Sequence, residues 1–449
     1  MNIVVIAASR ENVPERVAPL GAYIVAGSLK KSGHNVDFLD LAFCNSSETP
    51  IKEAFHKQKP DLIAISIRNI NIQTFPKSVF TLPLVKSVVD NCRKFSDAKI
   101  IIGGSGFSIM PEQIFEALDV DFGLVGEAEF AIQHFAEHFD SPKLFATPGL
   151  VYRNSDNKIA YNKPELIDDV NYAPLKRYNL SDYPSVNIQT KRGCVFRCNY
   201  CSYPVLEGRT IRKREAASVA QEIEYFSKQK RDFYFVDSVF NFPSTHATEI
   251  CREIIKRKIS IKWSCEIHPR YMDKDLALLM SKAGCKSVNI GVDSLSESVV
   301  QQIKKDFTLD EVDKCNKYLV ENSIEPRYFI LFGHLSDTKD TISETFLNIK
   351  RLGLKNGRIM TGVRVYPQTD LASALKEKGL VKSVDLRPTY CFFGDRQREM
   401  LEYISSFAQD YPGWAFPGLE SKNSDWEKYL SLDDWKITPD SIRTESIIY

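Results

Sequence analysis

Apolar and polar positions follow a regular order along the first 145 residues. β-Branched runs such as NIVVIAA (2–8) and DLIAISI (61–67) are typical of buried strands, whereas PLGAYIVAGSLKKSG (19–33) carries apolar residues at helical spacing between a proline and a glycine. Strand and helix patterns succeed each other throughout this region. Because that order is typical of a parallel sheet covered by helices, we predict a doubly wound, Rossmann-like α/β domain over residues 1–145.

The pattern is lost over residues 146–187, which are rich in Asn, Asp, Tyr and Pro, and we interpret this stretch as a connector. The alternation resumes near residue 188 and continues through six strand patterns to residue 380, which predicts a partial (β/α)6 barrel. Residues 381–449 are aromatic-rich and are expected to form a small C-terminal cap. Four aromatic residues there either line a substrate cleft or form the core of the cap: Trp414, Phe416, Trp426 and Trp435.

Composition narrows the class of protein mainly by exclusion. The 449 residues carry a net charge of +1, so there is no charge excess that would attract nucleic acid or an anionic membrane. No apolar run reaches membrane-spanning length, and the N-terminus is interpreted as a first strand and not as a signal peptide. The ten cysteines, three of them clustered, favour metal binding in a reducing compartment over disulfides. We therefore expect a cytoplasmic protein with no nucleic-acid or membrane partner.

The stretch GCVFRCNYC (193–201) places Cys194, Cys198 and Cys201 in a C-x3-C-x2-C spacing. Structural zinc usually takes four ligands, and the cysteines that could supply a fourth lie in predicted strands and helices, where they are interpreted as core residues. An iron–sulfur cluster fits better, because three thiolates leave one iron of four open for another ligand. The loop also follows the first predicted barrel strand, and barrel chemistry is found at that end of the strands.

In this context the cysteine loop, with Tyr200 before its third cysteine, resembles that of the radical S-adenosylmethionine (SAM) superfamily. The resemblance implies that the three cysteines bind a [4Fe-4S] cluster and that SAM chelates its open iron. It also implies that an electron from a donor such as flavodoxin or ferredoxin can cleave SAM to a 5′-deoxyadenosyl radical. Tyr200 is predicted to contribute to cofactor binding.

Five further barrel residues are candidate SAM contacts, and three of them also have an ordinary structural alternative. Asp293 and Ser294, in GVDSLSE (291–297), match a SAM-contacting segment but would also make good helix N-caps. Asp237 follows the second barrel strand, where the Gly-Gly-Glu motif of the superfamily is absent. Glu266, at the end of the third strand, is equally well explained as a solvated rim residue. Arg364 is a candidate for binding the SAM carboxylate.

The first 145 residues resemble the cobalamin-binding domain of one branch of this superfamily. The resemblance rests on PLGAYIVAGSLKKSGHNVDFLD (19–40), KPDLIAISI (59–67), IIIGGSGFSIMPEQ (100–113) and DFGLVGEAE (121–129). Loops at the carboxyl ends of the strands would form a crevice for the flat cofactor. The predicted cofactor-binding residues are Ser66, Arg68, Gly103, Gly104, Gly106, Gly126 and Glu127. Turn geometry is the alternative for the glycines, and a dinucleotide site is a weaker one, since no G-x-G-x-x-G follows the first strand.

Arg68 is the predicted catalytic residue. The D-x-H-x-x-G motif, whose histidine ligates cobalt in other cobalamin proteins, is absent, so no histidine is expected below the cobalt. Arg68 would lie there instead, and a guanidinium that stays protonated cannot ligate a metal. Its surroundings are similar to those in tryptophan 2-C-methyltransferases of thiopeptide biosynthesis, which implies an empty lower axial site that favours four-coordinate Co(I). An ion pair with a nearby acid is the alternative.

Together the two resemblances imply a cobalamin-dependent radical SAM methyltransferase. It would move a methyl group from SAM, via methylcobalamin, to an unactivated or weakly nucleophilic carbon of a small molecule or peptide in natural-product biosynthesis. A cyclase or rearrangement enzyme without methyl transfer is the first alternative, and formation of S-adenosylhomocysteine would distinguish the two. A cobalamin-binding sensor is the second, and it is disfavoured because the sequence has no evident DNA-binding helix pair or basic patch.

Overall fold

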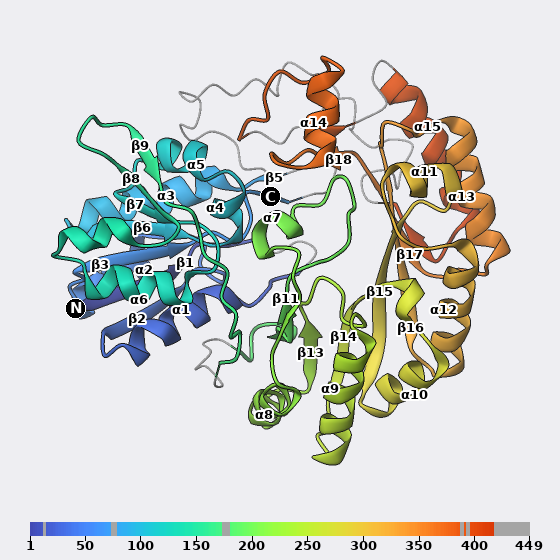
Figure 1. The fold of residues 1–449 in the computed structure, drawn as a ribbon, viewed down its shortest axis with the longest axis horizontal. Coiled ribbons are helices and arrows are strands. Elements are labelled where there is room, and N and C mark those ends of the chain that lie inside the picture. Colours follow the sequence, from blue (N-terminus) through green and yellow to red (C-terminus); the bar gives the residue numbers. More distant parts are fainter. Residues whose placement is uncertain (12–14, 73–78, 173–179, 387–389, 392–395, 417–449) are drawn as a thin grey trace.

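The computed structural model describes residues 1–11, 15–72, 79–172, 180–386, 390–391 and 396–416. Over these residues the chain forms two large sheets that lie side by side, each with helices packed around it (Figure 1). This is the predicted α/β architecture, a doubly wound domain followed by an open barrel. Trp426 and Trp435, with much of the predicted cap, lie outside the described residues.

The first sheet has seven strands, of which the first five in sheet order are parallel. Its order is β2-β1-β3-β6-β7-β8-β9. The bounds are β1 Asn2–Ala7, β2 Asn35–Asp40, β3 Leu62–Ser66, β6 Lys99–Gly103, β7 Phe122–Leu124, β8 Leu150–Arg153 and β9 Ile159–Tyr161. The last two pair antiparallel and come from residues 146–187, the stretch interpreted as a connector. None of the residues of β9 is buried, so this strand lacks the apolar pattern that marks the others.

Helices cover both faces of this sheet because alternate residues of a strand point to opposite sides. In β1, Ile3 and Val5 pack into one core, and Val4 and Ile6 pack into the other. The first core includes α1 (Leu20–Lys31) and α6 (Ala128–Glu137), and the second includes α2 (Glu48–Lys57), α3 (Leu82–Phe95) and α5 (Pro111–Leu118). Shorter elements are α4 (Ser105–Ile109), the ribbon of β4 (Asn71–Ile72) and β5 (Val79–Phe80), and the 3-10 helix η1 (Pro142–Ala146).

The second sheet is an open barrel of parallel strands in the order β10-β13-β14-β15-β16-β17-β20. The bounds are β10 Val186–Ile188, β13 Asp232–Phe235, β14 Lys262–Ile267, β15 Cys285–Asp293, β16 Glu325–Phe332, β17 Gly357–Thr361 and β20 Trp414–Ala415. The first six are the predicted barrel strands, and the seventh comes from the region expected to be a cap. Trp414 and Phe416 are buried in the core of the barrel, so they form neither the wall of a cleft nor the core of a separate cap.

Helices pack on the outer face of the barrel. They are α8 (Ala216–Ser227), α9 (Ser244–Lys256), α10 (Lys274–Lys282), α11 (Glu297–Gln302), α12 (Leu309–Glu321), α13 (Lys339–Arg351) and α15 (Gln397–Ser406), with the 3-10 helices η2 (Pro269–Tyr271) and η4 (Ala408–Asp410). In the part of the chain that the structure describes, no helix is long and apolar enough to cross a membrane.

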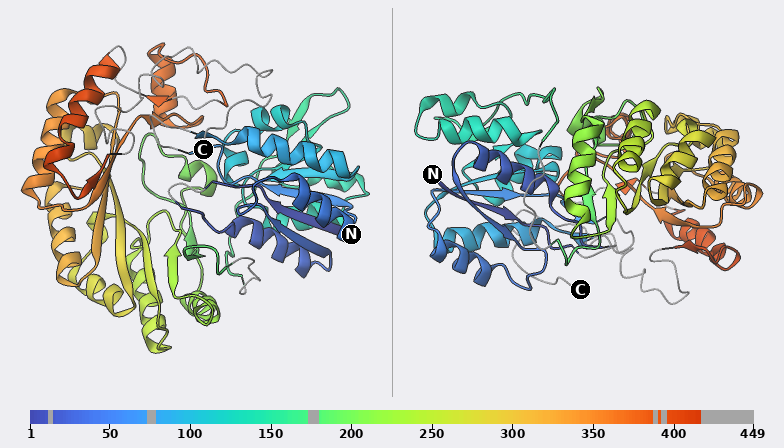
Figure 2. Two further views of the ribbon diagram at one scale, coloured as in Figure 1. Left: turned by 180° about the vertical axis from the view of Figure 1, so that it is seen from behind. Right: turned by 90° about the horizontal axis from the view of Figure 1, so that it is seen from below.

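After the sixth barrel strand the chain returns to the first domain (Figure 2). The elements of this segment are β18 (Val363–Arg364), α14 (Asp370–Glu377) and β19 (Tyr390–Cys391), and β18 pairs antiparallel with β19. Leu371 and Leu375 of α14 belong to the same core as Val4 and Ile6 of β1. The returning segment therefore packs the end of the barrel against the core of the first sheet.

Candidate functional site

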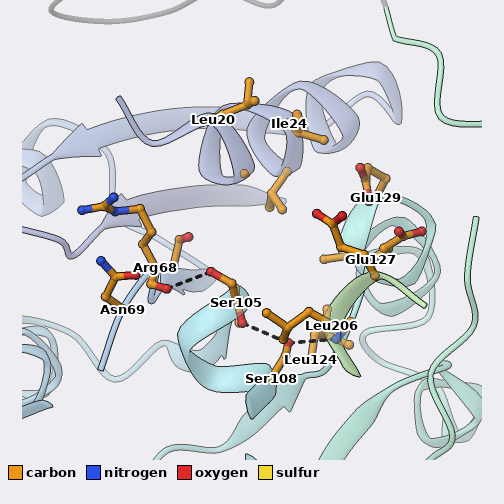
Figure 3. A pocket seen from close by; sticks show the side chains of 18 of the residues that line it. Leu20, Ile24, Arg68, Asn69, Ser105, Ser108, Leu124, Glu127, Glu129 and Leu206 are labelled. Carbon is orange, nitrogen blue, oxygen red and sulfur yellow. Dashed lines mark hydrogen bonds between the residues drawn. The ribbon is translucent and has the colours of Figure 1, made fainter. Parts of the chain in front are cut away.

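A cavity of about 520 Å³ lies between the carboxyl ends of the first sheet's strands and the start of the barrel. All of the predicted cobalamin-binding residues except Gly106 line this cavity: Ser66, Arg68, Gly103, Gly104, Gly126 and Glu127. Its apolar part includes Leu20, Ile24 and Leu124, and Figure 3 shows Arg68 across the cavity from Glu127. The opposite wall includes Tyr203, Leu206 and Glu207 of α7 (Tyr203–Glu207), the helix that follows Cys201. The cavity therefore touches both predicted cofactor regions.

The glycines after β6 are explained by a close approach of two loops. Gly104 has a φ of +101°, and a Cβ there would lie 2.5 Å from the Ile67 carbonyl oxygen. A Cβ on Gly106 would meet the Arg68 backbone at 3.1 Å. The close approach of the loops, with the positive φ of Gly104, explains why both positions need glycine and also sets the position of Arg68. The contact of these glycines with cobalamin stays a prediction.

Arg68 faces the cavity and is also part of an ion pair. Its Nη2 lies 3.7 Å from Oε2 of Glu11, and the two side chains are 30% and 4% exposed. The Ser105 hydroxyl donates to the Arg68 carbonyl oxygen at 2.8 Å, which holds the backbone of this residue (Figure 3). None of the described residues that line the cavity is a histidine. The ion-pair interpretation is therefore correct, and the catalytic role of Arg68 stays a prediction.

At the end of β7, Gly126 and Glu127 bind the protein itself. Gly126 has a φ of +84°, and its N–H donates to the Ser108 hydroxyl at 2.9 Å. The Glu127 carboxylate accepts from both terminal nitrogens of Arg212, at 2.5 and 2.6 Å, and from the Ile167 N–H at 2.8 Å. The carboxylate of Glu127 is thus already hydrogen-bonded to other residues of the chain through both of its oxygens. Its role in binding cobalamin stays a prediction.

The cysteine loop is held by its backbone from three sides. It lies between β11 (Lys191–Arg192) and α7, and β11 pairs antiparallel with β12 (Arg212–Lys213). Gly193 has a φ of +93°, and a Cβ there would lie 2.1 Å from the Thr210 carbonyl oxygen, so only glycine fits. The Asn199 N–H donates to Ile303 O at 3.1 Å, and its carbonyl accepts from the Leu371 N–H at 2.8 Å. The barrel and the returning segment therefore both fix the loop.

The three thiols are buried and influence one another. Burial raises the pKa of Cys194, Cys198 and Cys201, the last to about 12, and Cys198 raises the pKa of the other two further. The thiols therefore share one space, yet no three His, Cys, Asp or Glu side chains of the described residues are placed to hold one ion. Thiolates that bind different irons of a [4Fe-4S] cluster need not converge on one point. The positive charge of the metal would also stabilise thiolates that burial disfavours.

A buried triad of polar side chains lies beside the loop. The Tyr200 hydroxyl donates to Oδ2 of Asp293, and Lys305 Nζ lies 2.7 Å from the same oxygen. Burial lowers the pKa of Lys305, but the Asp293 carboxylate, together with Cys198 and Cys201, raises it above its usual value, so this lysine stays charged. Tyr200 and Asp293, both predicted from the sequence, are thus brought together. Nothing in the sequence distinguishes Lys305 from its exposed neighbour Lys304, because only the fold reveals which of them turns inward.

Two predicted SAM contacts are engaged by protein groups. Asp237 is buried and accepts from the Thr190 N–H at 2.7 Å and from Lys191 Nζ at 3.1 Å. The Ser294 hydroxyl lies 3.2 Å from Oγ1 of Thr345 and accepts from the Ser296 N–H at the same distance. The N-cap of α11 is Ser296, so the N-cap alternative is wrong for Asp293 and Ser294. The roles of Asp237 and Ser294 in binding SAM stay predictions.

Glu266 lies on the inner wall of the barrel, where buried and half-buried residues alternate along β14. It accepts from the Tyr234 hydroxyl at 2.6 Å and from Nδ2 of Asn289 at 2.9 Å. Burial raises the pKa of Glu266, and these two hydrogen bonds oppose the rise. Sequence reasoning missed Tyr234 and Asn289, although the alternation of β13 and β15 places both on the inner face. This polar wall can accept a hydrogen bond from a bound molecule.

Arg364 lies in the returning segment and not on a barrel strand. It is buried in β18, and its guanidinium carbon is 5.2 Å from the ring centroid of Tyr366. Tyr366 lines the cavity, so Arg364 is two positions along the chain from a residue of the cavity wall. Its role in binding SAM stays a prediction.

Comparison with known proteins identifies the two domains. The B12 binding domain family matches residues 6–136, and the Radical SAM superfamily matches residues 188–349. Tryptophan 2-C-methyltransferase of Streptomyces laurentii is 22% identical over 440 residues, which cover 81% of this chain and 72% of that protein. Anaerobic magnesium-protoporphyrin IX monomethyl ester cyclase of Rubrivivax gelatinosus is 25% identical over 356 residues, which cover 73% and 61%.

Solved structures agree on the fold. A radical SAM methyltransferase from Kitasatospora setae, solved with cobalamin and a [4Fe-4S] cluster bound, has a TM-score of 0.77 and 22% identity over 84% of this chain and 75% of that one. A cobalamin-dependent SAM radical enzyme with aqua-cobalamin bound also has a TM-score of 0.77, at 15% identity over 91% and 67%. The predicted class is confirmed: the chain joins a B12-binding domain to a radical SAM domain. It is an enzyme of the cobalamin-dependent radical SAM class, whose cofactors are a [4Fe-4S] cluster, SAM and cobalamin.

Proposed function

We propose that this enzyme transfers a methyl group from SAM to an unactivated or weakly nucleophilic carbon of a small molecule or peptide. The observation that carries the proposal is the shared cavity, whose walls come from the strand ends of the B12-binding domain and from the helix that follows the cysteine loop. Cobalamin and SAM, when bound, would supply a methyl carrier, a methyl donor and a source of radicals.

The residues of the chain have separable tasks in this proposal. Cys194, Cys198 and Cys201 hold the cluster and leave one coordination position open. Arg68 supplies a fixed positive charge at the cavity wall that cannot ligate a metal, because its guanidinium stays protonated. Glu266, held by two neutral donors, accepts a hydrogen bond from SAM or from the substrate.

Relatives of the chain support methyl transfer and keep one alternative open. Two similar proteins are named methyltransferases of carbon, the tryptophan enzyme and hopanoid C-3 methylase, whereas another is named a cyclase. One solved relative holds tryptophan as its substrate. For this chain we infer a small-molecule or peptide substrate, and a one-electron donor such as flavodoxin or ferredoxin for the cluster.

The test is a product analysis on protein reconstituted anaerobically with hydroxocobalamin, iron and sulfide. After iron and cobalt per chain are measured, the protein is incubated with SAM and a chemical reductant. We expect about one S-adenosylhomocysteine per cobalt, because without a substrate the reduced cobalamin would be the acceptor of the SAM methyl group. Formation of 5′-deoxyadenosine without any S-adenosylhomocysteine, in protein that holds both metals, would replace methyl transfer with the cyclase or rearrangement alternative.

A further inference from the structure

A network of buried charges crosses the boundary between the two domains at the wall of the cavity. Glu127 and Glu129 come from the start of α6, and Arg192 and Arg212 come from the ribbon of β11 and β12. Arg212 binds both oxygens of Glu127, at 2.5 and 2.6 Å, and Arg192 binds Glu129. The side chains of Glu127, Arg212 and Arg192 are 6%, 6% and 8% exposed. The first domain is therefore joined to the ribbon by ion pairs that exclude water.

The network continues into the cysteine loop. Nη2 of Arg212 also donates to the carbonyl oxygen of Glu207 at 2.7 Å, at the end of α7. Oε2 of Glu207 accepts from the Gly193 N–H at 3.1 Å. Gly193 precedes Cys194, and Arg192 precedes Gly193. An unbroken series of contacts thus runs from Glu127, at the cavity, to the first cysteine of the cluster loop.

The geometry of this pair is more restrictive than that of an ordinary surface ion pair. A guanidinium that binds a carboxylate through two parallel hydrogen bonds fixes both the distance and the angle between them. Arg212 is held further by the Ile167 carbonyl at 2.6 Å, and Glu127 by the Ile167 N–H at 2.8 Å. With both of its oxygens bound in this way, the carboxylate has little capacity left for a cofactor.

We propose that Glu127 and Arg212 form a positioning clamp that sets the separation and orientation of the cluster loop relative to the cobalamin cavity. Neither residue touches the reacting atoms in this proposal. The effect of this clamp on turnover rests on the proposed function. Its effect on the distance between the cluster and the cobalt does not. The clamp reassigns Glu127 from a cofactor ligand to a link between domains.

The test compares Glu127→Gln with the unchanged enzyme, both reconstituted with cobalamin and the cluster. The distance readout is the relaxation of the cob(II)alamin EPR signal, which a reduced cluster accelerates more strongly the closer it lies. We expect iron and cobalt contents to be unchanged, the acceleration to be altered, and S-adenosylhomocysteine formation to fall by about 10- to 100-fold, since misplacement by about 1 Å has effects of that order.

Glu222→Gln is the matched control. It breaks another buried pair, with Arg214 Nη1 2.6 Å from Oε2 of Glu222 and side chains 1% and 0% exposed, but this pair lies within the barrel half. Both variants should lose thermal stability, and only Glu127→Gln should alter the relaxation. Exchanging the charges, with Glu127→Arg and Arg212→Glu together, should restore part of the wild-type relaxation.

Loss of cobalt from Glu127→Gln would overturn the proposal, because it would make Glu127 a cofactor ligand. Unaltered relaxation would overturn it as well. If Glu127→Gln does not fold, Arg212→Lys keeps the charge, removes the two-point contact and is measured in the same way. The proposed function and the clamp can fail separately. If the wild-type protein shows accelerated relaxation but forms no S-adenosylhomocysteine, the proposed function is wrong and the clamp proposal is unaffected.

Discussion

The two cofactor regions of this molecule are built in opposite ways. On the B12-binding side, the cavity wall consists largely of backbone, small residues and apolar side chains, such as Gly103, Gly104 and Leu124. Beside the cysteine loop, titratable side chains are buried in contact with one another, as Tyr200, Asp293 and Lys305 are. The first surface suits a large cofactor recognised by shape, and the second suits charged ligands. Added atoms should therefore damage the first region, and removed ligands or charges should damage the second.

The largest expected effect comes from removing a ligand on the charged side. Cys198→Ala should abolish the cluster and all SAM chemistry while leaving cobalamin binding intact, because two thiolates cannot replace three. Iron and cobalt per chain, measured after reconstitution, check this directly. Iron and SAM turnover at wild-type levels would contradict the assignment of the cluster ligands.

Cys285→Ser is the matched control for that experiment. Cys285 is 1% exposed in β15, and its thiol contacts the Ser287 carbonyl oxygen at 3.6 Å. A buried hydroxyl in place of this thiol should lower the free energy of unfolding by about 1 kcal/mol, without changing the iron content. Loss of iron from this variant would show that Cys285 is a cluster ligand and not a core residue.

A smaller effect is expected from adding one methyl group on the shape-dependent side. Gly104→Ala places a Cβ 2.5 Å from Ile67 O at a φ of +101°, so the loops after β3 and β6 must move apart. We expect a loss of about 2–4 kcal/mol in the free energy of unfolding and weaker cobalamin binding, with iron unchanged. Denaturant unfolding and the cobalt-to-iron ratio measure the two effects.

Gly353→Ala is the matched control, because it introduces backbone strain without a steric clash. Gly353 also has a positive φ, +60°, but no atom lies within 4 Å of its added Cβ. This variant should lose only about 1 kcal/mol and should keep its cobalamin. Equal cobalamin loss in the two glycine variants would mean that backbone strain, and not the approach of the loops, explains the effect.

How far the sequence alone predicts the fold depends on how deeply each strand is buried. Strands with buried faces, such as β1 and β15, carry apolar patterns that make them predictable. The edge strand β9 has no buried residue, and β20 has only two residues, so neither carries a periodic signal. Long buried strands are therefore evident in the sequence, and edge strands emerge only from pairing in the fold.

Candidate site residues follow a similar division. The three predicted cluster ligands lie within eight consecutive positions, 194–201, so their spacing alone predicts the cluster. The partner of Glu127 is Arg212, 85 positions away in the other domain, and a local motif cannot reveal such a pair. The sequence therefore predicts that Glu127 lies at the cavity, which is correct, but not that its carboxylate faces the ribbon.

The smallest structural effect, and the sharpest chemical one, is expected for Arg68→His. Arg68 faces the cavity with its side chain 30% exposed, and its pair with Glu11 is long at 3.7 Å, so the substitution should change stability by no more than about 1 kcal/mol. A neutral imidazole, unlike a guanidinium, can ligate cobalt. The cob(II)alamin EPR spectrum of the variant should therefore gain nitrogen hyperfine splitting, and S-adenosylhomocysteine formation should slow. Arg68→Leu, which also breaks the pair but cannot ligate, should show no such splitting. If both variants give the wild-type spectrum, Arg68 does not lie beneath the metal, and its charge serves the ion pair with Glu11 and not the cofactor.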